Sequence, residues 1–68
     1  PGTGTWVIQP GDTLWHVAER TAGDRLGRPA SLAETATQLD RLIRLNATRL
    51  AVPRDADLVF PGQEFLVP

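Results

Sequence analysis

A chain of 68 residues has room for one small domain, and residues 1–68 are expected to form it. The absence of cysteine excludes disulfide staples and thiolate metal sites. The formal net charge of −1, without a basic stripe, argues against a nucleic-acid surface, and no apolar run approaches the roughly 20 residues that cross a bilayer.

The first predicted element is a strand over residues 5–9. Its sequence, TWVIQ, is rich in β-branched and aromatic residues. Pro10 and Gly11 then suit the centre of a type II turn, because proline presets φ and glycine accepts a positive φ. Asp12 follows, and its carboxylate is expected to cap the next helix.

A short helix is predicted after this turn. Leu14, Val17 and Ala18 recur at the spacing of one helical face, which is expected to be buried. The stretch AGDRLGRPA, residues 22–30, contains two glycines and a proline. It is therefore predicted to end this helix and to form an extended loop between two helices.

The second predicted helix begins with a capping box, SLAE, in which Ser31 caps the helix and Glu34 reaches back. It runs to about Leu45, and Asn46 is expected to end it. Helical spacing gives it a buried stripe with two flanking residues. The stripe consists of Leu32, Ala36, Leu39 and Ile43, with Leu42 and Leu45 on the flank.

The rest of the chain is predicted to be an extended connection, residues 47–57, then a second Pro-Gly corner and a closing strand, residues 64–68. The fold class is therefore α+β, in the order β-α-α-β, with its core in residues 5–68. The two strands are expected to pair antiparallel under both helices. Side chains expected to face the helices are those of Trp6, Ile8, Phe65 and Val67.

Three stretches of the sequence resemble a LysM domain. They are WVIQPGDTLWHVAER near the start, LIRLN with its closing asparagine, and DLVFPGQEFLVP at the end. The resemblance implies a βααβ fold and a non-catalytic module, without cofactor or metal, that binds N-acetylglucosamine glycans such as peptidoglycan or chitin. It also implies an extracellular or cell-wall location, as a monomeric module within a longer chain. The loops at 22–30 and 47–57 are longer than is usual in the family.

The resemblance further implies a shallow groove between two loops. Its residues would be Gly11, Asp12, Thr13 and Leu14 from the first loop, and Asp57, Leu58, Val59, Phe60 and Pro61 from the second. An acetamido group presents one donor, one acceptor and one methyl. A glycine turn and a helix start offer exposed backbone groups for the first two, and the apolar side chains offer a floor for the methyl.

Several alternatives stay open. The same fold without a working groove would be a protein-interaction or spacer module. A glycosidase using Asp12 and Asp57 is disfavoured, because so small a domain offers little desolvation to raise a carboxyl pKa. Trp15 either packs or stacks on a glycan, and Phe60 either packs or lines the groove. The use of arginine without lysine, together with many alanines, points to a GC-rich bacterial genome and so favours peptidoglycan over chitin.

Overall fold

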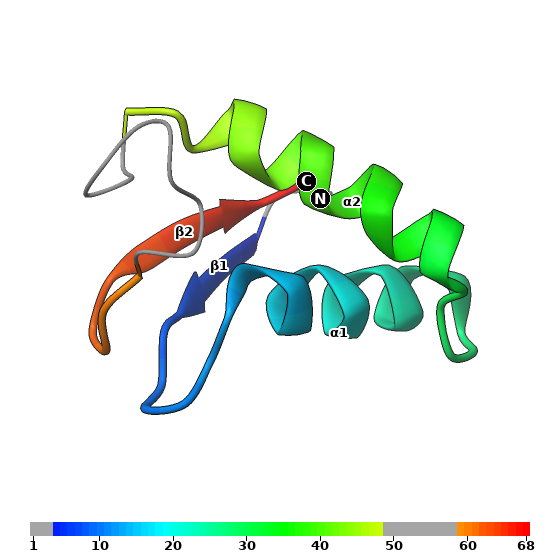
Figure 1. The fold of residues 1–68 in the computed structure, drawn as a ribbon, viewed down its shortest axis with the longest axis horizontal. Helices are drawn as coiled ribbons and strands as arrows, with labels where there is room; N and C mark the ends of the chain where they lie inside the picture. Colours follow the sequence, from blue (N-terminus) through cyan, green and yellow to red (C-terminus); the bar gives the residue numbers. More distant parts are fainter. Residues whose placement is uncertain (1–3, 49–58) are drawn as a thin grey trace.

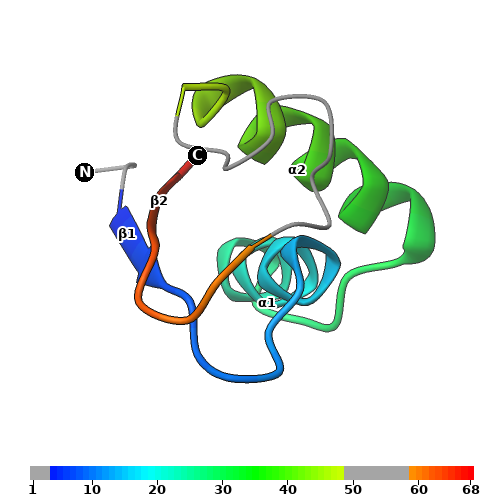
Figure 2. The same ribbon diagram turned by 60° about the vertical axis from the view of Figure 1, so that its left-hand side comes forward.

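The computed structural model describes residues 4–48 and 59–68. Its elements are strand β1 (Gly4–Val7), helix α1 (Leu14–Leu26), helix α2 (Leu32–Leu45) and strand β2 (Glu64–Val67). The predicted order and the α+β class are confirmed. Figure 1 shows the two helices spreading from the loop that joins them, with the strands across their open end. Figure 2 shows both helices on the same side of the two-stranded sheet.

The sheet joins the two ends of the described chain. β1 and β2 are antiparallel, with Gly4 opposite Val67 and Trp6 opposite Phe65. Ile8 and Phe65 are buried in the main hydrophobic cluster, and Trp6 packs against it. These three residues of the predicted inward face are confirmed, whereas Val67, the fourth, is partly buried.

Helix α1 begins and ends elsewhere than predicted. Thr13, not Asp12, is its cap, because the Thr13 hydroxyl accepts from the His16 N–H at 3.1 Å. The helix continues through Gly23 to Leu26, so the loop between the helices covers residues 27–31 rather than 22–30. The buried face of α1 ends at Ala22, and the last turn, residues 23–26, is largely exposed and is closed by the Gly27 cap.

Gly27 ends α1 in the left-handed conformation, at φ +71°. Its N–H and that of Arg28 both donate to the Gly23 carbonyl, at 2.8 and 3.3 Å. The loop then crosses close over Gly23, where a Cβ would lie 3.3 Å from the Arg28 carbonyl oxygen. The two glycines therefore have different tasks: Gly27 reverses the chain, and Gly23 makes room for it.

Replacing Gly27 by alanine is expected to destabilise the domain by about 1–2 kcal/mol, because an L-residue is strained at this φ. Urea unfolding monitored by circular dichroism would measure the loss. Gly4→Ala is the matched control, since Gly4 has an ordinary φ and an added Cβ there meets no atom within 4 Å. Equal midpoints for Gly27→Ala and Gly4→Ala would contradict this account.

Helix α2 starts with the predicted capping box. The Ser31 hydroxyl accepts from the Glu34 N–H at 3.1 Å, and a Glu34 carboxylate oxygen accepts from the Ser31 N–H at 2.9 Å. The same carboxylate takes two hydrogen bonds from Arg28, at 2.8 and 2.6 Å. Arg28 therefore fastens the inter-helix loop to the start of α2.

The Arg28 hydrogen bonds, followed by that from the Ser31 N–H, lower the pKa of Glu34 to about 2. A depressed folded-state pKa stabilises the fold above the unfolded pKa of about 4.3, and this contribution is lost as pH falls towards 2. Glu34→Gln should therefore flatten the acid side of a plot of melting temperature against pH. Asp40→Asn, which removes only an exposed pair with Arg44, should leave it unchanged. An unaltered acid limb in Glu34→Gln would contradict the assignment.

The buried face of α2 is rotated from the predicted stripe. Leu32 is 76% exposed and Ala36 is also exposed, so placing these two in the stripe was wrong. The fully buried residues of the helix are Thr35, Gln38 and Leu42, with Leu39 and Ile43 partly buried. Polar residues are tolerated inside because they are hydrogen-bonded. The Thr35 hydroxyl donates to the Ser31 carbonyl one turn earlier, and the Gln38 amide donates across the helix pair to the Thr21 hydroxyl of α1.

Asn46 ends α2 as predicted, and it also holds strand β2. Its side chain is buried. The amide nitrogen lies 2.8 Å from the carbonyl oxygens of both Leu42 and Leu66, and the amide oxygen accepts from the Leu66 N–H at 2.7 Å. The Asn46 side chain thus joins the last turn of α2 to strand β2.

Candidate functional site

Two Pro-Gly turns, residues 9–12 and 60–63, frame the candidate site. The Asp12 N–H donates to the Gln9 carbonyl at 3.0 Å, and the Gln63 N–H donates to the Phe60 carbonyl at 3.1 Å. Their glycines have φ values of +88° and +91°. Both are therefore type II turns with proline and glycine at the central positions, as predicted for the first.

A side chain closes each turn a second time. Asp12 Oδ2 accepts from the Gln9 N–H at 2.9 Å, and Gln63 Oε1 accepts from the Phe60 N–H. In each turn, the fourth residue is therefore hydrogen-bonded to the first through both its backbone and its side chain. This is the role of the Asp12 carboxylate, and the prediction that it caps α1 is wrong.

The two turns lie side by side at one end of the sheet. The Ile8 N–H donates to the Gln63 carbonyl, and the Gly62 N–H donates to the Ile8 carbonyl, both at 2.8 Å. Figures 1 and 2 both show the blue and orange loops next to each other. Since two backbone hydrogen bonds join them, the turns form one rigid corner of the molecule.

The Asp12 carboxylate has several polar partners in this corner. Besides the Gln9 N–H, Oδ2 accepts from Trp6 Nε1 at 3.1 Å, and His16 Nε2 lies 4.0 Å from Oδ1. The Trp6 and His16 rings meet edge to face, with centroids 6.4 Å apart. The pKa of Asp12 is lowered, first by the hydrogen bond from the Gln9 backbone, then by that from Trp6.

The first loop offers backbone more than side chains. Gly11 and Thr13 are exposed, whereas the Leu14 side chain is only 2% exposed and belongs to the core. Leu14 therefore provides no apolar floor. The first intrahelical hydrogen bond runs from the Val17 N–H to the Thr13 carbonyl, so the N–H groups of Leu14 and Trp15 have no carbonyl partner within the helix. Among the described residues, what this loop presents to solvent is the exposed glycine turn and the Thr13 cap.

The second loop is described in part. Asp57 and Leu58 lie outside the described residues. Val59 is partly buried against the core, whereas Phe60 is 54% exposed and Pro61 is exposed. Phe60 and Pro61 are therefore apolar surfaces that the described part of this loop offers to a ligand.

Two contributions to the corner were missed at the sequence level: the second closure by Gln63 and the bond from Trp6. A signal for the first was present, because PGD and PGQ place a side-chain acceptor directly after each Pro-Gly pair. Trp15, left open between packing and stacking, is 40% exposed. It stands in the first turn of α1, two residues beyond the Thr13 cap.

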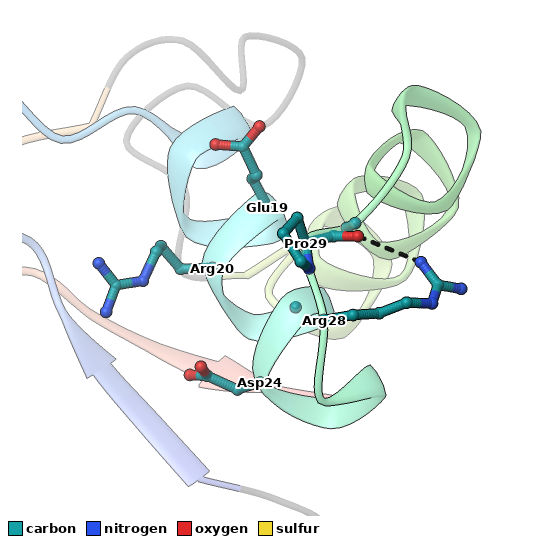
Figure 3. A pocket seen from close by; sticks show the side chains of 7 residues that line it. Glu19, Arg20, Asp24, Arg28 and Pro29 are labelled. Atoms are coloured by element: carbon teal, nitrogen blue, oxygen red, sulfur yellow. Dashed lines mark hydrogen bonds between the residues drawn. The ribbon is translucent and has the colours of Figure 1, made fainter.

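Two surface hollows lie at the opposite end of the helices. The larger, about 290 Å³, lies between α1 and the inter-helix loop and is lined by Glu19, Arg20, Asp24 and Pro29 among others (Figure 3). The other, about 200 Å³, lies beside Leu26 and Ala33. No predicted site residue lines either hollow. In Figure 3 the Arg20 side chain extends away from Arg28 and Pro29.

Within residues 4–48 and 59–68, no group of three or more histidine, aspartate or glutamate side chains is placed to hold a metal ion. Neither helix in this part of the chain is long and apolar enough to cross a membrane.

A family model for the LysM domain matches residues 7–68, a span that contains both turns, both helices and β2. A search of curated proteins found no match, and neither did a search of solved structures. LysM domains are carbohydrate-binding modules for glycans that contain N-acetylglucosamine, and they are generally non-catalytic. They typically occur in extracellular or cell-wall proteins.

Proposed function

The chain belongs to the LysM domain family, and on this premise we propose that it binds bacterial peptidoglycan without catalysis. The proposed site is the groove between the loop that follows β1 and the loop that precedes β2. It would act outside the cell or at the cell wall, as a monomeric module of a longer chain. Arginine usage without lysine supports the bacterial ligand over chitin.

The observation that carries this proposal is the pair of doubly closed turns held side by side. An acetamido sugar needs one acceptor, one donor and a small apolar surface at fixed positions. Spare backbone groups near Gly11 and at the start of α1, together with the exposed Phe60 ring, offer these. Because the turns are already ordered, little ordering cost falls on binding.

Binding to one module is expected to be weak. A shallow groove buries little area, and a millimolar Kd corresponds to only about −4 kcal/mol. Several linked modules on one polymer would raise the avidity without new contacts. Assays should therefore use high ligand concentrations or intact cell-wall polymer.

Titration of the ¹⁵N-labelled domain with soluble peptidoglycan fragments, and in parallel with chitin oligomers, tests the proposal. We expect amide shifts confined to residues 11–14 and 57–61, with the peptidoglycan fragments binding more tightly. Silence with both ligands at millimolar concentration would reject glycan binding and favour an interaction or spacer module. Tighter binding of chitin oligomers would keep the groove but replace the ligand.

A pulldown on purified cell-wall sacculi, with and without stem peptides, separates recognition of sugar from recognition of peptide. We expect retention on both preparations, because the proposed contacts are to the acetamido sugar. Retention only when stem peptides are present would move the ligand from the glycan to the peptide. Release of reducing ends over time would show catalysis instead.

A further inference from the structure

We propose that Trp6 and Asp12 form a positioning pair for the glycan site and do not themselves contact the sugar. In this assignment, which rests on the proposed function, the Trp6 indole N–H holds the carboxylate that closes the first turn. The backbone around Gly11 is thereby fixed for the ligand.

The surroundings of Asp12 argue against direct sugar contact. Its side chain is only 13% exposed. One carboxylate oxygen already accepts two hydrogen bonds, from the Gln9 N–H and from Trp6 Nε1, and the other faces His16 Nε2 at 4.0 Å. Oδ2 is already occupied by these two donors, and because the side chain is so little exposed, a sugar hydroxyl has little access to Oδ1.

Trp6 connects this carboxylate to the core. It lies in β1 opposite Phe65, and its ring packs against the hydrophobic cluster. The Trp6 ring also meets the His16 ring edge to face, with centroids 6.4 Å apart. The indole N–H is therefore a fixed donor, six residues before the carboxylate that it binds.

The loop itself depends on this connection. Gly11, at the centre of the turn, is exposed, and it has the freest backbone of any residue type. A turn closed only by its own backbone bond would sample more conformations, and the ligand would bear the cost of ordering it. The bond from Trp6 removes part of that cost, because it ties the turn to a strand residue that packs against the core.

Trp6→Phe keeps an aromatic ring in the core and removes only the indole side that bears the N–H. We expect roughly fivefold weaker binding of peptidoglycan fragments, with a folded amide spectrum. The pKa of the Asp12 carboxyl, followed by ¹³C chemical shift, should rise, because one of the bonds that lowers it is gone. Trp15→Phe is the matched control and should leave the pKa of Asp12 unchanged.

The outcomes distinguish the positioning role from the proposed function. Unchanged affinity in Trp6→Phe, with wild type binding normally, would overturn the positioning pair and leave glycan binding intact. Absence of binding by wild type would overturn both. Weaker binding without a rise in the Asp12 pKa would also reject the pair, because the loss would then come from ring packing.

Should Trp6→Phe fail to fold, chemical synthesis allows a closer replacement. A benzothienyl side chain at position 6 has a bicyclic ring of similar shape, with sulfur in place of the N–H. The same weaker binding and raised Asp12 pKa are expected. Wild-type affinity in this variant would reject the proposal.

Discussion

Asn46→Asp is expected to destabilise the domain by about 3 kcal/mol, although the two side chains have nearly the same shape. The asparagine amide donates to the Leu42 and Leu66 carbonyls and accepts from the Leu66 N–H. Aspartate loses both donations and turns a buried negative charge towards two carbonyl oxygens. Urea unfolding followed by tryptophan fluorescence would measure the difference.

Gln9→Glu is the control for this substitution. It makes the same change from amide to carboxylate at an exposed position, where the amide makes only a 3.4 Å contact with the Val7 carbonyl. We expect it to change stability by less than about 0.5 kcal/mol. If Asn46→Asp were as stable as Gln9→Glu, the bonds from Asn46 to β2 would not be what holds the strand.

Gly11→Ala is expected to weaken glycan binding roughly tenfold, or by about 1.4 kcal/mol. The added Cβ meets no atom of the described residues within 4 Å, so it projects into the space where the proposed ligand would approach. The positive φ of Gly11 also makes alanine strained, at about 1 kcal/mol of stability. Calorimetry or amide shifts with peptidoglycan fragments would give the affinity.

Gly62→Ala separates these two effects. Gly62 has nearly the same φ and an equally open Cβ position, and it stands at the same place in the second turn. It was not predicted to contact the sugar. Both variants should lose similar stability, but only Gly11→Ala should lose affinity. Equal affinity losses would mean that the strain, and not the methyl group, disturbs the site.

The order of the elements could be predicted because local signals agree with the fold. The Pro-Gly corners, the Ser31 capping box and the stop at Asn46 each act over a few residues, and each is present in the structure. The end of α1 could not be predicted, because Gly23, a helix breaker by preference, lies inside the helix where the following loop crosses close over it. The face of α2 was also missed, because Gln38 is buried by a tertiary bond to Thr21.

In the candidate site, too, local features could be predicted and tertiary contacts could not. Sequence reasoning placed the two turns in adjacent loops, and the pairing of β1 with β2 brings them together. It assigned Asp12 to the helix, because an acidic residue near a helix start is a common cap. The competing partners, the Trp6 indole and the Gln9 N–H, become available only when the turn folds back on the strand. Which carboxylate meets which donor is therefore a three-dimensional property.

The pairing of Gly4 with Val67 also determines how the domain would respond to a mechanical load. The start of β1 and the finish of β2 lie at the same edge of an antiparallel ladder, so a pull on these two points loads one rung at a time. In this geometry the hydrogen-bonded pairs break one after another, at a lower force than when all of them are loaded at the same time. We expect the sheet to part first under tension, up to Leu66, where the Asn46 side chain adds two further bonds.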